Sequence, residues 1–163
     1  MNLKEFMGLG FKPVYLAAIM VSDNLFRAVT INSLFSAEIM PRREEVGLVI
    51  ANKSRFLNCL IDRGLFSIGL LDALSEQEAR FFSTNQRADL DVGDQPNWTE
   101  MKGVPVFSMA TASVVLELND IISRNENSLV LTRVVEFIGG IEGGPLHYGR
   151  ADLETSATYR SFD

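Results

Sequence analysis

The sequence predicts a mainly β protein, most simply a small antiparallel barrel with a few short helices. Apolar or alternating segments recur at hairpin spacing between turn-forming residues, and we expect six or seven strands. Only two segments carry helix signals, and both are short. Closure into a barrel would also remove exposed strand edges. The sequence contains no internal repeat, so it does not predict a solenoid or a propeller.

The composition is that of an ordinary globular domain. The chain has 163 residues, of which 47% are hydrophobic and 22% charged, so one domain over residues 1–163 can bury a sizeable core. We expect residues 1–13 to form an N-terminal arm and residues 153–163 a C-terminal tail. The formal net charge of −6 argues against a nucleic-acid partner, because such a binder needs a basic surface.

Cysteine content and hydropathy indicate the compartment. Cys59 is the only cysteine, which excludes an internal disulfide and suits a reducing compartment. The longest apolar run, residues 14–21, has eight residues, whereas a membrane-spanning helix needs about 20. No small-x-small cleavage site follows this run, so we expect no signal peptide. We therefore expect a cytoplasmic protein with no membrane partner.

The N-terminal part predicts a short arm and three strands. Residues 1–11 suggest a weak helix or a loose arm. Residues 14–21 predict a buried strand by their length and flanks. The Ser-Asp-Asn turn at 22–24 leads to a second strand over residues 25–35, so the two form a hairpin. A polar connection precedes a third buried strand over residues 46–51.

Residues 52–64 have the clearest helix signals in the chain. Asn52 or Ser54 can cap the first turn. Gly64 follows the last turn as a C-terminal cap. The apolar residues at helical spacing are Phe56, Leu57, Leu60 and Ile61. Cys59 lies among them, and we expect it in the core.

The middle of the chain predicts a strand, a helix and a loop. Residues 65–71 alternate as a strand. Ser75 and Glu78 form a capping box for a short helix over residues 75–82. The polar residues 83–103 predict a long loop, of a length that usually has a function. We expect Trp98 and Met101 to anchor this loop to the body of the protein.

The C-terminal part predicts a long hairpin. Residues 111–122 place Val114, Leu116 and Leu118 on one face of a strand. A turn at 124–127 leads to an alternating strand over residues 128–138. The glycine-rich residues 139–144 predict a further hairpin turn, after which the chain enters a polar tail.

Common catalytic signatures are missing from the sequence. There is no CxxC pair, no GxSxG elbow and no P-loop. His147 is the only histidine, and we expect it to be structural or on the surface. A zinc site built on one histidine and one cysteine would need carboxylates as further ligands.

Two polar stretches remain as candidate binding elements. Residues 30–36 (TINSLFS) place hydroxyls and an amide in an otherwise apolar strand, and residues 52–55 (NKSR) begin a helix after a buried strand. A helix N-terminus attracts phosphate, although Ser54 could simply cap the helix. If the strands 25–35 and 46–51 are neighbours, the two stretches together suit a phosphorylated planar cofactor.

Several motifs resemble one family in their order and spacing over residues 14–152. They are TINSLFS (30–36), Pro41, VGLVIA (46–51), NKSRF (52–56), GLFSIGLLDALSEQEARFFS (64–83), GVPVF (103–107) and PLHYGR (145–150). This pattern is similar to that of the flavin reductase-like family, the FMN-binding split barrels. The resemblance implies an antiparallel split β-barrel, Greek-key-like, with a few short helices.

The resemblance also implies a cofactor and a site. Family members bind FMN or FAD, use NADH or NADPH as co-substrate, are usually homodimers, and include the reductase components of two-component monooxygenases. It implies that Ser54 and Arg55 hold the flavin phosphate, helped by Lys53 and the Asn52 backbone, and that Phe82 lies near the cofactor. The residues that would line the flavin are Thr30, Ile31, Asn32, Ser33 and Ser36.

One position departs from the family pattern. Many members have a histidine near the flavin and nicotinamide where this chain has Asn127, and a glycine where it has Thr132. Asn127 can donate a hydrogen bond but cannot carry a positive charge. The leading hypothesis is an NAD(P)H-dependent flavin reductase. The alternatives are a flavin-bound redox protein without direct NAD(P)H use and a cofactor-free dimeric interaction module.

Overall fold

The fold is mainly β and antiparallel, as predicted. The computed structural model describes residues 12–37, 45–84, 89–139, 146–148 and 159–161. Within these ranges eight strands form one sheet in the order β4-β5-β11-β10-β6-β2-β3-β7, and every pair in it is antiparallel. Its outermost strands, β4 and β7, do not pair with each other among the described residues, so the sheet does not close into a complete barrel.

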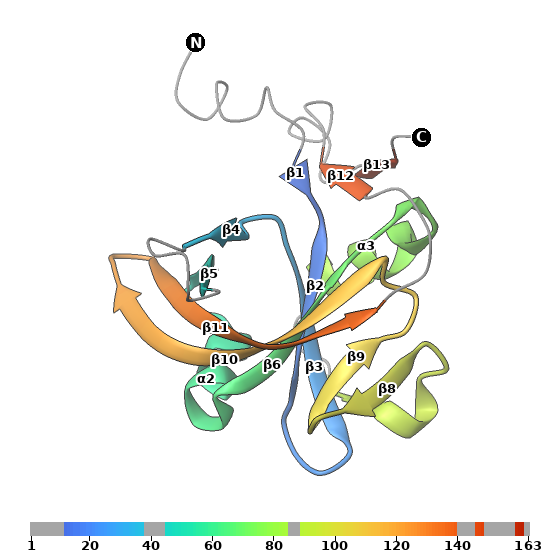
Figure 1. The fold of residues 1–163 in the computed structure, drawn as a ribbon, viewed down its shortest axis with the longest axis horizontal. Coiled ribbons are helices and arrows are strands. Elements are labelled where there is room, and N and C mark those ends of the chain that lie inside the picture. Colours follow the sequence, from blue (N-terminus) through green and yellow to red (C-terminus); the bar gives the residue numbers. More distant parts are fainter. Residues whose placement is uncertain (1–11, 38–44, 85–88, 140–145, 149–158, 162–163) are drawn as a thin grey trace.

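The elements follow one another closely along the chain (Figure 1). The strands of the large sheet are β2 (Tyr15–Met20), β3 (Leu25–Ile31), β4 (Phe35–Ser36), β5 (Glu45–Ala51), β6 (Leu65–Leu70), β7 (Leu90–Asp91), β10 (Ala112–Ser123) and β11 (Asn127–Gly139). The α-helices and 3-10 helices are α2 (Arg55–Arg63), η1 (Ala73–Ser75), α3 (Glu76–Thr84) and η2 (Val92–Asp94).

Two smaller sheets complete the architecture. In one, β8 (Trp98–Met101) and β9 (Val104–Phe107) form a hairpin. In the other, β12 (Leu146–Tyr148) pairs with both β1 (Lys12–Pro13) and β13 (Tyr159–Ser161). Segments from the two ends of the chain therefore lie side by side, as Figure 1 shows at its top. Part of the expected tail is thus paired with the rest of the protein.

Strand β2 explains why residues 14–21 read as a continuous apolar run. Its alternate residues Leu16, Ala18 and Met20 belong to a core under α3, together with Phe26, Phe82 and Trp98. The residues between them, Ala17 and Ile19, belong to a second core under α2. Because β2 is buried on both faces, neither face needs polar residues and the sequence shows no alternation.

The first predicted helix is confirmed in detail. Ser54, not Asn52, is its N-cap, and Gly64 ends it with φ of 74°. That left-handed conformation suits glycine, which has no Cβ to clash. Phe56, Leu57 and Leu60 are buried as expected, but Ile61 is 56% exposed and does not join the core.

The second predicted helix is present, but its cap is different. Asp72 accepts hydrogen bonds from the backbone N–H and the hydroxyl of Ser75, at 3.2 and 3.1 Å. The Ser75 side chain is therefore a partner of the cap rather than the cap itself. A 3-10 turn, η1, separates Asp72 from α3, so the expected capping box at Ser75 and Glu78 was wrong.

The long loop expected over residues 83–103 was wrong in its second half. β7, η2 and β8 all lie within it, and β8 pairs with β9 from Trp98↔Phe107 to Met101↔Val104. Trp98 is an anchor, because only 8% of it is exposed. Met101 is not, since it is 40% exposed near the hairpin turn.

The strand expected over residues 25–35 is interrupted. Regular pairing stops at Ile31, and a separate short strand, β4, pairs with β5. β3 lies at the far side of β2 from β6 and does not neighbour β5. The expectation that the two whole strands are neighbours was therefore wrong; only the end of the first stretch reaches β5. The expectations for residues 1–11, for Pro41 and for residues 140–144 lie outside the described residues.

Candidate functional site

The start of α2 is a positively charged helix end. The Ser54 hydroxyl oxygen accepts a hydrogen bond from the Phe56 backbone N–H at 3.2 Å, which leaves the hydroxyl proton available to donate. Lys53 and Arg55 are exposed on either side of it, and the first turn contains no acidic residue. The helix dipole adds to this charge, so the position favours an anion.

Asn52 ties the start of α2 to the turn between β10 and β11. Its Nδ2 donates to the carbonyls of Arg124 and Asn125 at 2.8 and 3.1 Å, and its Oδ1 accepts from the Ser128 hydroxyl at 2.7 Å. Its backbone N–H donates to the Glu126 carbonyl at 2.8 Å. Both the backbone donor and the carboxamide of Asn52 are thus engaged within the protein, and their effect is to position the helix start.

The same contact places Asn127 near α2. Asn127 is the first residue of β11 and pairs with Ala51, the last residue of β5. Its side chain is exposed. Two segments more than 70 residues apart in the sequence therefore meet at the end of β5. Thr132, further along β11, is fully buried and donates to the Val46 carbonyl at 2.8 Å, which gives it a structural role.

The polar residues after β3 divide between two places. The Ser33 hydroxyl donates to the Val49 carbonyl at 3.1 Å and accepts from the Val49 N–H at 3.3 Å. These are the two bonds that the backbone of a neighbouring strand would make with Val49 of β5. Asn32, just before it, is exposed. Ser36 pairs with Val46 at the other end of β5, away from the start of α2.

Thr30 and Phe82 belong to the side of the sheet under α3. The Thr30 hydroxyl donates to the Ala79 carbonyl of α3 at 2.7 Å. Phe82 is 4% exposed and its ring packs against Trp98, with centroids 5.6 Å apart. Ile31, next to Thr30 in β3, points to the opposite side and packs in the core under α2. Within one chain, the eleven candidate residues do not form one site.

We call the group at the end of β5 the β5-end cluster: Ser33, Asn52, Lys53, Ser54, Arg55 and Asn127. Ser33 and Asn52 hold it in shape through the hydrogen bonds given above. Ser54 and the two cations provide donors and positive charge without a carboxylate in the helix turn. These residues fit a phosphate group, because donors and positive charge converge on one helix end.

Arg27 is a part of this region that sequence reasoning missed. It lies in β3, is 3% exposed, and donates from Nη1 to the Arg55 carbonyl and to Cys59 Sγ, both at 3.2 Å. Its Nη2 forms an ion pair with Asp89, and its Nε is buried without a partner among the described residues. The only signal was one arginine in an apolar strand, LFRAVTI.

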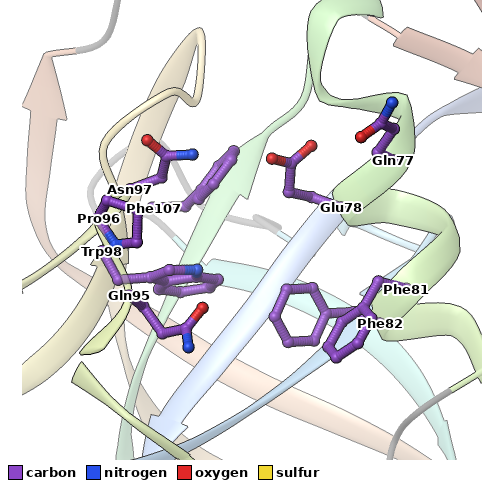
Figure 2. A pocket seen from close by; sticks show the side chains of 9 residues that line it. All are labelled: Gln77, Glu78, Phe81, Phe82, Gln95, Pro96, Asn97, Trp98 and Phe107. Carbon is purple, nitrogen blue, oxygen red and sulfur yellow. The ribbon is translucent and has the colours of Figure 1, made fainter. Parts of the chain in front are cut away.

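A cavity of about 460 Å³ lies beside Phe82, between α3 and the β8–β9 hairpin (Figure 2). Its lining consists of Gln77, Glu78, Phe81, Phe82, Gln95, Pro96, Asn97, Trp98 and Phe107. Phe82 is the only predicted site residue in this lining. The cavity contains no lysine, arginine or histidine, which distinguishes it from the start of α2.

Two further classes of site are absent from the described part of the chain. No group of three or more histidine, cysteine, aspartate or glutamate side chains there is arranged to hold a metal ion. In the same ranges, no helix has the length and apolar character to cross a membrane.

Comparison with known proteins adds the family. The family model described as "Flavin reductase like domain" matches residues 7–156. A comparison with curated proteins gives no significant sequence match. Among solved structures, the styrene monooxygenase flavin reductase of Pseudomonas putida S12 is similar with a TM-score of 0.81 and 20% identity, covering 100% of this chain and 98% of that one.

Two other structures are similar in fold. The NADH:FAD oxidoreductase of Streptomyces globisporus C-1027 has a TM-score of 0.81 and 19% identity, with 99% of this chain and 92% of that chain covered. An FMN-binding protein from Thermus thermophilus, solved with bound p-hydroxybenzaldehyde, has a TM-score of 0.76 and 18% identity, with 91% and 87% covered. At these identities the likeness shows the fold.

Proposed function

The chain belongs to the flavin reductase-like family, and from that premise we propose that it is an NAD(P)H-dependent flavin reductase that supplies reduced FMN or FAD to a partner oxygenase. The observation that supports this most is the β5-end cluster. A capped helix start with two exposed cations and no acidic residue in its first turn is suited to the phosphate of a flavin nucleotide.

Each residue of the cluster has a separate role in the proposal. The Ser54 hydroxyl donates to the phosphate, while Lys53 and Arg55 offset its charge. Asn52 and Ser33 keep the helix start and the end of β5 in place through their bonds to the β10–β11 turn and to Val49. The flavin, when bound, supplies the hydride chemistry, and the protein orients it.

Asn127 bears on the use of nicotinamide. It belongs to the β5-end cluster and is exposed, so it can donate a hydrogen bond to a ligand there. Hydride transfer itself requires no acidic or basic side chain, and an asparagine at this position is compatible with reductase activity. It also favours a second candidate, a flavin-bound redox protein that a partner reduces without direct NAD(P)H use.

Oxidation of NADH and NADPH, followed at 340 nm with FMN, FAD and no flavin, separates the two candidates. The reductase proposal requires turnover with at least one donor and one flavin. A protein that binds flavin and is reduced by dithionite, but oxidises neither donor, is the second candidate. A protein that leaves flavin fluorescence unchanged does not bind flavin. This result would exclude both candidates and favour the dimeric interaction module.

Ser54→Asp tests the phosphate position directly. Aspartate is also a good N-cap and a favourable charge for the helix dipole, so the helix should remain folded. Its carboxylate should repel phosphate, and we expect FMN affinity to fall by at least about tenfold, or 1.4 kcal/mol. The affinity for riboflavin, which lacks the phosphate, should fall much less. Flavin fluorescence titration measures both.

Ser22→Asp is the matched control. Ser22 is exposed in the turn between β2 and β3, and Arg63 at the C-terminal end of α2 donates to the carbonyl of the adjacent Val21. The same substitution is thus made at the opposite end of the helix, where FMN affinity should stay unchanged. Equal FMN affinity for Ser54→Asp and the parent would mean that Ser54 only caps its helix.

The remaining parts of the proposal concern assembly and location. We propose a homodimer, because the outer face of the sheet at β5 and β11 carries exposed apolar side chains that include Val49 and Val135. The partner oxygenase follows from the kind of protein to which the fold is similar, such as the reductase of a styrene monooxygenase. A cytoplasmic location agrees with the single unpaired cysteine.

A further inference from the structure

The cavity beside Phe82 has the size and shape of a small-molecule site. Its volume of about 460 Å³ lies within the range of about 300–1,000 Å³ usual for ligand pockets. Figure 2 shows α3 forming one wall with Gln77, Glu78, Phe81 and Phe82, and the segment that carries Gln95, Pro96, Asn97 and Trp98 forming the other. Both walls are fixed to the core under α3, one through Phe82 and the other through Trp98.

Rigid aromatic rings form the inner surface of the cavity. Trp98, Phe107 and Phe82 are 8%, 3% and 4% exposed. The Trp98 ring lies 5.3 Å from that of Phe107 and 5.6 Å from that of Phe82. Phe81 stands edge-on to Phe82 at 5.0 Å and is 42% exposed. Because the buried rings are held by their neighbours, a flat ligand could stack on them at little cost in side-chain entropy.

The polar groups of the cavity are acceptors and amides. Among the described residues, the side chains of Glu78, Gln77 and Gln95 have no hydrogen-bond or ion-pair partner. Glu76, two residues earlier on α3, contrasts with Glu78 because Arg80 binds it at 2.7 Å. Figure 2 shows the Glu78 carboxylate between the two walls, across from Asn97. With no cation in the lining, a partly buried carboxylate favours donors and disfavours anions.

We propose that this cavity is a binding site for a planar aromatic molecule that carries N–H donors and is cationic or uncharged, with Glu78 as its polar anchor. The aromatic rings recognise the flat face of the ligand and would also attract a cation. The Glu78 carboxylate accepts from its N–H groups. Such a ligand is unlike a flavin nucleotide, whose phosphate suits the β5-end cluster, so the cavity is a second site that does not depend on the proposed function.

Three compounds of nearly one shape test the proposal. Benzamidine is a cationic N–H donor, benzamide is an uncharged one, and benzoate is an anion. Trp98 is the only tryptophan of the chain and lines the cavity, so its fluorescence reports binding at this position. We expect affinity to decrease from benzamidine to benzamide to benzoate, with at least about a tenfold interval between the first and the last, as for a charge-assisted hydrogen bond.

Two variants assign the effect to the cavity. Glu78→Gln should remove the preference for benzamidine over benzamide while keeping the fluorescence response to both. Glu76→Gln, on the same helix but outside the lining, should keep the parent's order of affinities. Phe81→Ala should lower the affinity for all three compounds by similar factors. Circular dichroism spectra check that each variant is folded.

Several results would overturn the proposal. Benzoate binding as tightly as benzamidine would show that Glu78 is not the polar anchor. An unchanged preference for benzamidine over benzamide in Glu78→Gln would show the same. Absence of a Trp98 response to all three compounds at millimolar concentration would mean that the cavity binds no such ligand. Displacement of benzamidine by FMN in equilibrium dialysis would show that the cavity is part of the flavin site and not a second one.

Discussion

At the scale of single residues, Arg27 is the most consequential side chain that the sequence did not reveal. It is a buried cation that joins three parts of the protein: β3, the first turn of α2 through the Arg55 carbonyl, and the chain after α3 through Asp89. Burying a charge is costly unless it is paired. The segment that carries Asp89 is therefore required to stabilise the strand and the helix start.

The two partners of this ion pair should respond unequally to mutation. Asp89→Asn leaves the Arg27 charge buried and only partly compensated, whereas Arg27→Met leaves Asp89, whose side chain is 27% exposed, able to reach water. We expect Asp89→Asn to lower the free energy of unfolding by about 2–3 kcal/mol and Arg27→Met by less. Urea unfolding measures both. A larger loss for Arg27→Met would show that its bonds to Arg55 and Cys59 matter more than the charge.

At the scale of elements, the β8–β9 hairpin has an unfavourable turn residue. Lys102 has φ of 55° and Gly103 has φ of 78°, the two positive values of a type I′ turn. Glycine adopts this conformation freely, but lysine pays roughly 1 kcal/mol for its Cβ. Asparagine is preferred at the first position because it tolerates the left-handed region.

Lys102→Asn should therefore stabilise the protein, and Gly103→Ala should destabilise it. The first change also removes an exposed ion pair with Glu136, at 3.4 Å, which contributes little. We expect a net gain of about 0.5 kcal/mol for Lys102→Asn and a loss of about 1 kcal/mol for Gly103→Ala. Thermal unfolding followed by Trp98 fluorescence should show shifts of opposite sign. Shifts of the same sign would contradict the turn assignment.

The same elements show what a sequence can predict. Helix α2 was predicted with its cap, its buried face and its end, because all three signals lie within about ten residues. The β8–β9 hairpin was missed because Lys-Gly is a weak turn signal and the flanking strand WTEM is short and has two polar residues among its four. The cap of α3 was assigned to Ser75 because the intervening 3-10 turn, which moves the cap to Asp72, leaves no mark in the sequence.

In the candidate site, too, features formed by adjacent residues were predictable and contacts between distant residues were not. The start of α2 was predictable because its residues are adjacent in the sequence. The contact of Asn52 with residues 124 and 125 and the pair Arg27–Asp89 join positions 62 to 73 residues apart. The separation of Thr30 and Phe82 from Ser54 depends on the order of strands in the sheet. The sequence suggested β5 as the neighbour of β3, and this one error combined two separate regions into one expected site.

At the scale of the whole molecule, the outer face of β5 and β11 carries exposed apolar side chains beside the Arg133–Glu117 ion pair, whereas a solvent-facing sheet surface is usually polar. Val49 lies directly opposite Leu129 in the register and is 42% exposed, and Val135 of β11 is 49% exposed. The opposite face of both strands packs on α2 through Leu48, Ile50, Val130 and Val134. An exposed apolar patch on the outer face of a sheet is suited to pairing with another sheet, and a second copy of this chain offers a matching surface.

Val49→Glu should therefore separate the proposed dimer. A buried, unpaired carboxylate at the interface would cost more than the interface gains there, so we expect a mass near twice 18.1 kDa for the parent and near 18.1 kDa for the variant, by light scattering after size exclusion. Ile61→Glu is the control, because Ile61 is similarly exposed but lies on α2, on the other side of the sheet. A monomeric parent would remove the homodimer from the proposal. A dimeric Val49→Glu variant would show that the interface lies elsewhere, since a pairing through the outer face of β5 could not accommodate the charge.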